Sequence, residues 1–242
     1  GDRNTEFVSF RLTPFARNLK CFNMRKFTRK VAAMFLVLIA ALITNAQSKD
    51  EIYLFSYFKD NGQDGLHLAY SSDGYTWKPL KNDSSFLTPT AGKDKLMRDP
   101  CIIRGADGKF HMVWTVSWNE QGIGYASSDD LIHWSEQQYI PVMAHEDSAR
   151  NCWAPEIFYD EKNKVYMMYW ATTIPGRFPS SEKSGDDKYN HRMYYTTTKD
   201  FKTFTDTKLF MDPGFSIIDA VIVKRGEDDY VQVLKDNTRP NR

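Results

Sequence analysis

Two short sequence elements recur in a fixed order along this chain, and their repetition restricts the folds available to it. The first is a strand-like run, a polar turn and a second strand-like run, and it occurs at 99–115, 154–170 and 219–235. The second is a strand-like run that ends in an aromatic corner, and it occurs at 66–77, 123–134 and 193–204. Together they give about four strands per unit at a spacing of roughly 55 to 70 residues, which is typical of β-propeller blades. A β-sandwich would also alternate short strands, but it would not repeat both elements in order.

The remaining pattern places these units in an all-β chain. Apart from one apolar run near the N-terminus, short apolar or aromatic runs alternate with Asp, Gly and Asn, without helical periodicity. The run at 52–58 resembles the second strand of the unit, and the chain ends soon after the second strand of the unit that begins at Ile217. We therefore predict an incomplete β-propeller of about three to four blades, in which the first lacks its innermost strand and the last is cut short.

The apolar run lies in a segment with the features of a secretory signal peptide. Residues 24–46 begin with a cationic stretch, continue with an apolar run at 31–43 and end in small residues before Gln47. The run is short for a permanent membrane helix, although an uncleaved anchor is the alternative. We expect 1–23 to be an upstream segment that is not native and 24–46 to be a signal peptide that forms a helix. Residues 47–242 would be the partial propeller domain, secreted or periplasmic and free of the membrane once mature.

Net charge, cysteine content and aromatic content bear on the expected partners and on disulfide bonds. The formal net charge of +1 gives no bulk attraction to nucleic acid, so we expect no nucleic-acid partner. Cys101 and Cys152 remain in the mature chain, and because two cysteines are no disulfide framework, their pairing is left open. Aromatic residues make up 14% of the chain, and both strands and sugar-binding clefts favour them.

Acidic side chains occupy equivalent places near the start of the repeated unit. Asp99 and Asp219 align in two units, and Ala154 fills the same place in the unit between them. Glu156 stands two positions later, on the same side of its strand. Because the first strand of each blade lines the central channel, we expect three carboxylates to converge on one axis. Asp before Pro also starts turns, but Asp219 lies in an apolar run, where an acid is costly unless it is paired or used.

Converging carboxylates indicate the chemistry of glycosidic bond hydrolysis. That reaction needs two carboxylates in opposite protonation states, one ionised to activate water and one protonated to donate to the leaving oxygen. A third acid close to the proton donor raises the pKa of the donor by like-charge repulsion. The sequence therefore predicts a glycoside hydrolase site at one end of the propeller axis.

These residues resemble the motifs of glycoside hydrolase family 43. The matching stretches are RDPCII at 98–103, WAPEIF at 153–158 and IIDAVI at 217–222, together with the corner SSDDLIHW at 127–134. The resemblance covers essentially all of 51–242, and RDP and WAPE in this order are more specific than either motif alone. It implies a five-bladed β-propeller that hydrolyses arabinose- or xylose-containing oligo- or polysaccharides with inversion of the anomeric configuration.

The resemblance also assigns roles to residues. Asp99 matches the general base, and Asp219 matches the acid that tunes the pKa of the proton donor. The residues expected to bind substrate are Arg98, Trp118, Trp153 and Glu156. The family's general acid is a Glu in a Glu-Gly-Pro motif of a later blade, and no such motif occurs in this sequence. We therefore expect this chain alone to lack the full mechanism, with takeover of the acid role by Glu156 as the alternative.

Other functions stay open at this point. A β-fructosidase of the invertase group shares the Arg-Asp-Pro motif, but its Asn-Asp-Pro nucleophile motif is absent upstream of Asp99, which would then stabilise the transition state. A propeller glycoside phosphorylase would need a basic phosphate pocket. The presence of Arg98, Arg104 and Arg150 in the sequence does not decide whether such a pocket exists. The stretch at 71–77 resembles the corner of sialidases, a structural feature. A propeller that binds glycans without cleaving them would share all of these features.

Cofactors and further substrate contacts are less constrained. Members of the family often hold a calcium ion near the axis, but the five His and scattered Asp show no ligand spacing typical of zinc or of a calcium loop, so calcium is left open. We expect His191 to be packed or at the surface rather than in the channel. The segment from Thr173 to Lys188 is long and polar enough to wall a cleft. Four side chains are candidates for stacking on sugars, with packing as the alternative: Trp114, Trp118, Trp153 and Trp170.

Overall fold

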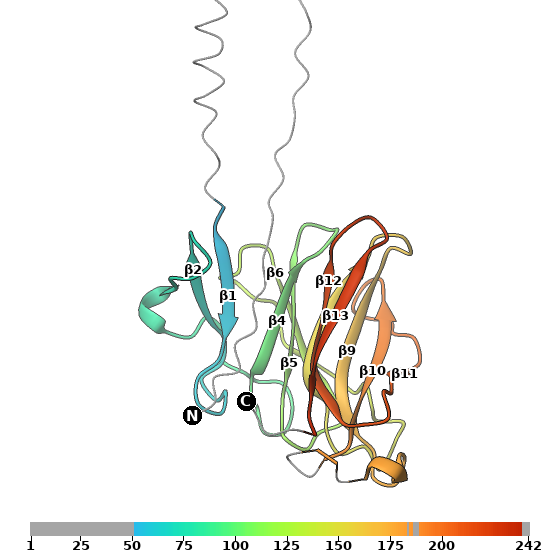
Figure 1. Ribbon diagram of the computed structural model, residues 1–242. Coiled ribbons are helices and arrows are strands. Elements are labelled where there is room, and N and C mark those ends of the chain that lie inside the picture. Colours follow the sequence, from blue (N-terminus) through green and yellow to red (C-terminus); the bar gives the residue numbers. More distant parts are fainter. Residues whose placement is uncertain (1–50, 183, 186–188, 239–242) are drawn as a thin grey trace, which may run out of the picture.

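The computed structural model describes residues 51–182, 184–185 and 189–238, and almost all regular structure in them is β-strand (Figure 1). The expected upstream segment 1–23 and signal peptide 24–46 lie outside the described residues. Within the described residues, no helix has the length and apolar character needed to cross a membrane.

The strands form four antiparallel sheets, which we call the first to fourth blades in chain order. The first blade contains β1 (Tyr53–Tyr57), β2 (His67–Ser71) and β3 (Lys78–Pro79), followed by the 3-10 turn η1 (Lys81–Asp83). The second contains β4 (Arg98–Arg104), β5 (Phe110–Thr115), β6 (Ile123–Ser128) and β7 (Gln138–Ile140). The third contains β8 (Trp153–Asp160), β9 (Val165–Thr173), the 3-10 turn η2 (Pro179–Ser181), β10 (His191–Thr198) and β11 (Lys208–Met211). The fourth contains β12 (Ile217–Lys224) and β13 (Tyr230–Asp236).

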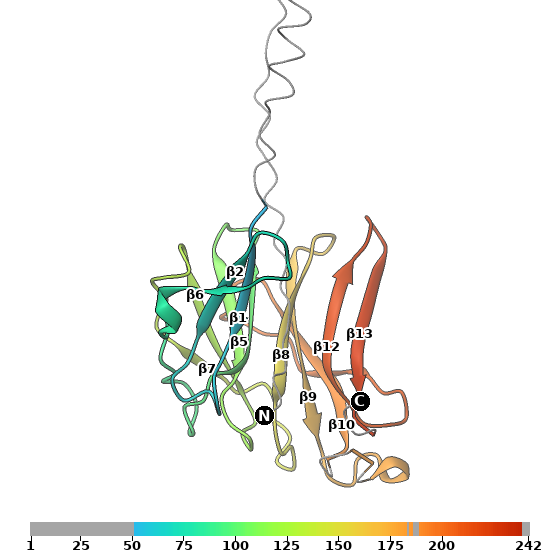
Figure 2. The ribbon, with the colours of Figure 1, turned by 60° about the vertical axis from the view of Figure 1, so that its left-hand side comes forward.

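Successive blades pack side by side through the first strand of each. Strand β4 contacts both β1 and β8, and β8 in turn contacts β12. Figures 1 and 2 show the blades following one another as upright sheets. Among the described residues the blades hold three, four, four and two strands, with β1 at the edge of its sheet next to β4. The prediction of an all-β propeller with one blade short at each end of the chain is confirmed.

Apolar side chains fill the spaces between neighbouring blades. One cluster lies between the first and second blades and contains Leu66, Leu68, Ile102, Met112 and Trp114. A second lies between the second and third blades and contains Cys101, Val113, Met168 and Trp170, and a third joins the third and fourth blades through Tyr169, Met193 and Ile217. Because each blade can bury its faces only against its neighbours, the hydrophobic effect holds the blades in this order.

The aromatic corners of the second repeated element are built alike in three blades. In each, a Ser or Thr hydroxyl at the end of a strand accepts a hydrogen bond from the backbone N–H three residues later, at 2.8 to 2.9 Å; the hydroxyls belong to Ser71, Ser128 and Thr198. An Asp two residues after the hydroxyl accepts two further backbone N–H groups through Oδ1; these are Asp73, Asp130 and Asp200. These bonds satisfy the polar backbone of a tight turn, so the corner is a structural device.

Candidate active site

The first strands of the second, third and fourth blades each carry a β-bulge at the same place. The register shifts fall between Arg98 and Cys101, between Trp153 and Glu156, and between Ile218 and Val221. Each bulge holds one residue in the left-handed region, with φ of 50° at Asp99, 44° at Ala154 and 53° at Asp219. For a residue with a side chain this conformation costs roughly 1 to 3 kcal/mol, so it persists only where the surrounding structure enforces it. The sequence alignment of these three positions therefore matches a real structural equivalence.

A bulge changes the direction in which side chains leave the strand. Asp tolerates the left-handed region better than most residues, which fits its presence in two of the three bulges. The bulge also interrupts the simple alternation from which we expected Glu156 to share a side with the position of Ala154. The side chain of Glu156 is buried, and its Oε2 lies 3.4 Å from the thiol of Cys101 on the neighbouring strand β4.

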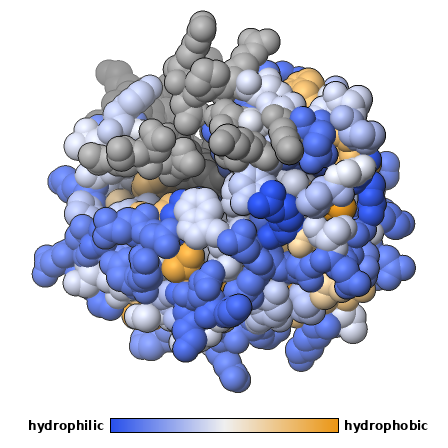
Figure 3. All heavy atoms as spheres, turned by 90° about the horizontal axis from the view of Figure 1, so that it is seen from below, coloured by the Kyte–Doolittle hydropathy of each residue, from blue (hydrophilic) through white to orange (hydrophobic). Residues whose placement is uncertain are grey.

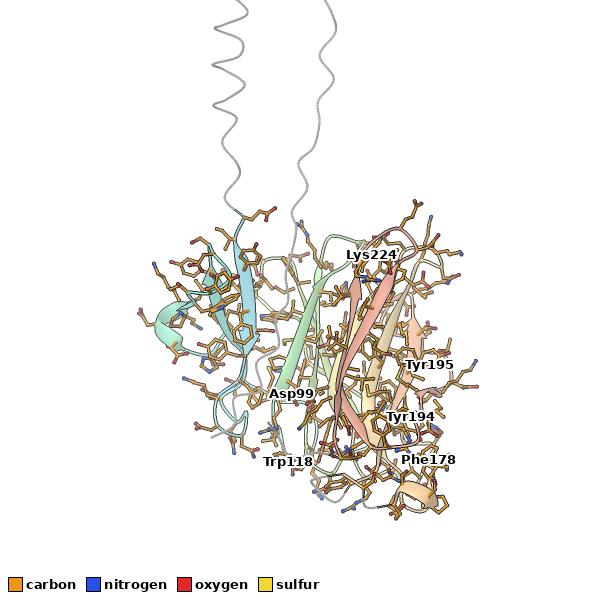
Figure 4. The ribbon with its side chains drawn as sticks, viewed as in Figure 1. Asp99, Trp118, Phe178, Tyr194, Tyr195 and Lys224 are labelled. Atoms are coloured by element: carbon orange, nitrogen blue, oxygen red, sulfur yellow. The ribbon has the colours of Figure 1, made fainter. Side chains whose placement is uncertain are left out.

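The two aspartates in the bulges lie near the same end of the molecule. Figure 4 shows Asp99 toward the lower end, with Trp118 below it, and Lys224 at the upper end. Because Lys224 is the last residue of β12, that strand begins at the lower end, as β4 does, and Asp219 is its third residue. Seen from below, the visible described residues at this end are mostly hydrophilic around isolated hydrophobic ones (Figure 3).

The carboxylate of Asp99 is held by a hydroxyl from the next strand. Thr115 Oγ1 donates to Asp99 Oδ2 at 3.2 Å, and the same oxygen accepts the backbone N–H of Ala154 at 2.9 Å. This chain of hydrogen bonds joins the bulges of the second and third blades. Burial raises the pKa of Asp99 above its usual value, although the positive charge of Arg98 and the Thr115 hydrogen bond act in the opposite direction. A carboxylate with a raised pKa accepts a proton from water more readily near neutral pH.

Arg98 lies between two aromatic rings beside this carboxylate. Its guanidinium carbon is 4.7 Å from the ring centre of Phe58 and 4.3 Å from that of Trp118. Its Nη1 donates to Oδ1 of Asn61 at 3.0 Å, and the indole Nε1 of Trp118 donates to the same oxygen at 3.0 Å. The predicted residues Arg98 and Trp118 are thus brought together by Asn61, which the sequence pattern did not indicate.

Trp118 and Trp153 form an aromatic wall next to Arg98. Their rings meet edge to face at 5.4 Å, and Trp153 Nε1 donates to the backbone oxygen of Trp118 at 3.0 Å. Tyr189 and His191 extend the wall, with ring centres 5.0 and 4.9 Å from that of Trp153. Trp118 is 42% exposed, and exposed aromatic faces are suited to stacking on sugar rings.

Two of the four tryptophan candidates are excluded from sugar binding. Trp114 and Trp170 have no exposed surface and belong to the clusters between blades, so the stacking role considered for them is wrong. His191 is fully buried, as expected for a packed side chain. Burial, aided by the charges of Arg150 and Arg192, lowers the pKa of His191 to about 3, so it is neutral at physiological pH.

The cysteines and the possible metal ligands bear on the disulfide and the calcium ion that the sequence left open. Cys101 and Cys152 are both buried and are not joined to each other, so the disulfide that we left open does not form. Among the described residues, no three His, Cys, Asp or Glu side chains are arranged to hold a metal ion. No chemical step is assigned to a metal.

The loop after β9 is fixed to the third blade by a buried arginine. Arg192 donates to Asn190 Oδ1 at 2.9 Å and to Ser181 Oγ at 2.7 Å, and it also pairs with Asp212. Its guanidinium lies 4.3 Å from the ring centre of Phe178, which Figure 4 shows at the same end as Trp118. The described part of the segment from Thr173 to Lys188 thus lies at the end of the molecule that carries the aromatic wall.

A separate groove of about 500 Å³ lies between the second and third blades. It is lined by residues 140–142 of the second blade and 204–207 of the third, together with His145 and Thr196. None of the predicted site residues lines it, so the groove does not belong to the site built on the bulges.

Comparisons with known proteins identify the family of this chain. Residues 50–241 match a family that is related to glycoside hydrolase family 43 and is described as "Probable glycosyl hydrolase domain". An α-L-arabinofuranosidase of Bifidobacterium longum subsp. longum is 24% identical over 179 residues, which cover 64% of this chain and 16% of that protein. The chain therefore spans about a sixth of the length of this relative.

Solved structures of propeller enzymes are similar in fold. An exo-β-1,3-galactanase from Phanerochaete chrysosporium matches with a TM-score of 0.54 and 14% identity, over 76% of this chain and 41% of that one. A family 93 α-L-arabinofuranosidase of Fusarium graminearum, solved with arabinobiose, matches with a TM-score of 0.50 and 16% identity, over 78% of this chain and 54% of that one. At these identities the similarity concerns the fold alone.

Proposed function

Because this chain belongs to the family of glycosyl hydrolases related to family 43, we propose that it forms the base-bearing part of a glycoside hydrolase site. The substrate is an arabinose- or xylose-containing oligo- or polysaccharide, and the reaction inverts the anomeric configuration. The single observation that carries the proposal is the repeated bulge, which brings Asp99 and Asp219 to equivalent positions at one end of the second and fourth blades.

The mechanism that we propose is a single displacement. Asp99 accepts a proton from a water molecule as that water attacks the anomeric carbon, and burial favours this step by raising the pKa of Asp99. A second carboxylic acid, roughly 6.5 to 9.5 Å from the base in inverting enzymes, protonates the leaving oxygen. Asp219 orients the substrate and tunes the pKa of that acid. The sequence contains no Glu-Gly-Pro motif to supply the acid, so we propose that the chain alone is weakly active or inactive.

The proposed substrate is supported by the aromatic wall and by one relative. Trp118 offers an exposed ring beside the guanidinium of Arg98, so apolar sugar faces and sugar hydroxyls would both find partners there. The relative from Bifidobacterium longum is named an α-L-arabinofuranosidase, which favours an arabinose-containing glycan. A polysaccharide substrate also agrees with a secreted or periplasmic location, which we propose on the basis of residues 24–46.

An assay of the full-length protein on aryl α-L-arabinofuranosides, β-xylosides and β-fructosides tests the proposal. We expect release from arabinofuranosides or xylosides, with the inverted anomer as the first product in proton NMR spectra. Asp99→Asn should lower kcat by roughly 10²- to 10⁴-fold, as expected for loss of a general base. Asp129→Asn is the matched control, because Asp129 is an exposed aspartate that pairs with Lys109.

The outcomes distinguish the alternative functions. Release from fructosides alone would overturn the assignment in favour of the invertase group. Binding of xylo- or arabino-oligosaccharides by the full-length protein without hydrolysis of any substrate would instead identify a glycan-binding propeller. Loss of activity in Asp129→Asn to the same extent as in Asp99→Asn would show that the effect is not specific to the bulge.

A further inference from the structure

Asn61 connects a cation and an aromatic ring at the mouth of the proposed site. Its side-chain oxygen accepts hydrogen bonds from Arg98 Nη1 and from Trp118 Nε1, both at 3.0 Å. A carbonyl oxygen has two lone pairs, so these two donors use its full acceptor capacity. Asn61 belongs to the first blade, whereas Arg98 and Trp118 belong to the second, so the contact crosses a blade boundary.

The turn that carries Asn61 is shaped to reach the second blade. Gly62 has φ of 81°, and a Cβ at this position would lie 2.6 Å from the backbone oxygen of Met97 and 3.1 Å from Cγ of Arg98. The backbone N–H of Met97 donates to the oxygen of Gly62 at 2.9 Å. Only glycine allows this close approach without strain, and the approach puts Asn61 within reach of Arg98.

The groups that Asn61 holds are not held by burial alone. Trp118 is 42% exposed, and apart from Asn61 its indole is held by ring contacts with Trp153 and Arg98, which restrain a rotamer less than a directed hydrogen bond does. The guanidinium of Arg98 lies between the rings of Phe58 and Trp118, with cation–π contacts at 4.7 and 4.3 Å. Such contacts do not fix the rotation of the guanidinium between the two rings. The hydrogen bond to Asn61 supplies that missing restraint.

We propose that Asn61 is a positioning residue, whose side-chain oxygen fixes the Arg98 guanidinium beside Asp99 and fixes the Trp118 ring as a sugar platform. For the sugar platform, the inference rests on the function proposed above. For Arg98 it rests on the hydrogen bond to Asn61 and on the place of Arg98 directly before Asp99 in β4, from which its charge acts on that carboxylate.

Two substitutions separate the roles of the side-chain oxygen. Asn61→Leu has a similar volume and no acceptor, so Arg98 and Trp118 are both released. We expect the pKa of Asp99 to rise, because the nearby positive charge is no longer fixed. We also expect affinity for arabino- or xylo-oligosaccharides to fall by roughly 3- to 10-fold, the effect of one lost hydrogen bond. Asn61→Asp keeps the acceptor, so it should restore affinity, while its negative charge still raises the pKa of Asp99.

The measurements do not depend on hydrolysis. The titration of Asp99 is followed by NMR of ¹³C-labelled carboxyl groups, with Asp99→Asn to assign its signal. The mobility of Trp118 is followed by iodide quenching of tryptophan fluorescence, with Trp118→Phe as the reference, and affinity is measured by calorimetry. Asn163→Leu is the matched control, because Asn163 lies in the β8–β9 turn and bonds only locally to Asp160.

The outcomes separate this inference from the proposed function. If Asn61→Leu lowers the melting temperature but moves neither the Asp99 titration nor the quenching of Trp118, the residue is merely structural and the inference is wrong. If both quantities move while no variant, including the unmodified protein, binds any oligosaccharide, the positioning role stands and the proposed function is overturned.

Discussion

Thr115 donates a hydrogen bond to the carboxylate of Asp99 while it accepts one from the backbone of Ala154, so one hydroxyl joins the bulges of two blades. Thr115 is almost completely buried, and no water can replace it without a change in packing. The position of the proposed base is therefore set partly by the third blade, on which Ala154 lies.

Replacement of Thr115 by Val tests this connection. Val has the same shape and no hydroxyl, so Asp99 loses a donor that lowers its pKa, and the acidic limb of the kcat/KM profile should move to higher pH. The buried N–H of Ala154 also loses its acceptor, which should lower the free energy of unfolding by about 1 to 3 kcal/mol in urea titrations. Thr115→Ser keeps the hydroxyl, so it should change the pH profile and the free energy of unfolding less than Thr115→Val does. An unchanged pH profile in Thr115→Val would contradict the role of this hydroxyl.

Asp99 should reduce the stability of the fold at neutral pH. Its pKa is raised in the folded state, so the folded protein binds this proton more tightly than the unfolded chain. The resulting stabilisation is full below the usual pKa near 3.8 and is lost as the pH rises through the folded value. Asp99→Asn removes the charge and tolerates the left-handed φ, so it should be more stable than the unmodified protein at pH 7. The difference should shrink toward pH 3.5 in urea titrations, and a constant difference would contradict the raised pKa.

Much of the fold could be predicted because the repeated units are local. The element at 99–115 became β4, a turn and β5, since period-two patterns and turn residues are encoded by neighbours in sequence. The equivalence of Asp99 and Asp219 was visible for the same reason. The one-residue shifts of register were not, because a bulge breaks the alternation from which we placed Glu156.

The contacts that organise the site were hidden because they join distant segments. Asn61 and Arg98 are 37 positions apart, and nothing in the turn that carries Asn61 indicates which strand it reaches. The sequence positions of two tryptophans do distinguish a core residue from an exposed one. Trp114 lies inside the strand β5 among apolar neighbours, as core residues do, whereas Trp118 follows the end of that strand and is exposed.

The aspartates of the aromatic corners should stabilise the fold in a pH-dependent way. Hydrogen bonds from the backbone N–H groups of Thr203 and Lys202 lower the pKa of Asp200 to about 2. A lowered folded pKa gives stability that is present above the usual value near 3.8 and is lost as the pH falls toward 2. Asp200→Ala should therefore melt at a lower temperature than the unmodified protein at pH 6, and the gap should narrow near pH 2.5. Asp147→Ala, at an exposed aspartate, is the control, and an equal loss in both variants would contradict the prediction.

Arg192 should control both the stability of the third blade and the placement of the aromatic wall. Its side chain is almost fully buried and is bound by Asp212, Asn190 and Ser181. Arg192→Met leaves Asp212 without its partner and frees the loop around Ser181. Removing one member of a buried ion pair typically costs 3 to 5 kcal/mol, and because Asp212 is partly exposed we expect about 2 to 3 kcal/mol here.

Release of this loop should also weaken the packing of Trp153. Tyr189 lies on the loop and contacts the ring of Trp153 at 5.0 Å, so its displacement loosens the aromatic wall. We expect Arg192→Met to be cleaved faster by trypsin-like proteases between η2 and β10 and to bind oligosaccharides more weakly than the unmodified protein. Arg225→Met is the matched control, because Arg225 is an exposed arginine that pairs locally with Asp229. If Arg192→Met lost stability yet kept its affinity and its resistance to protease, the loop would be held by other contacts, and Arg192 would serve only the packing of its own blade.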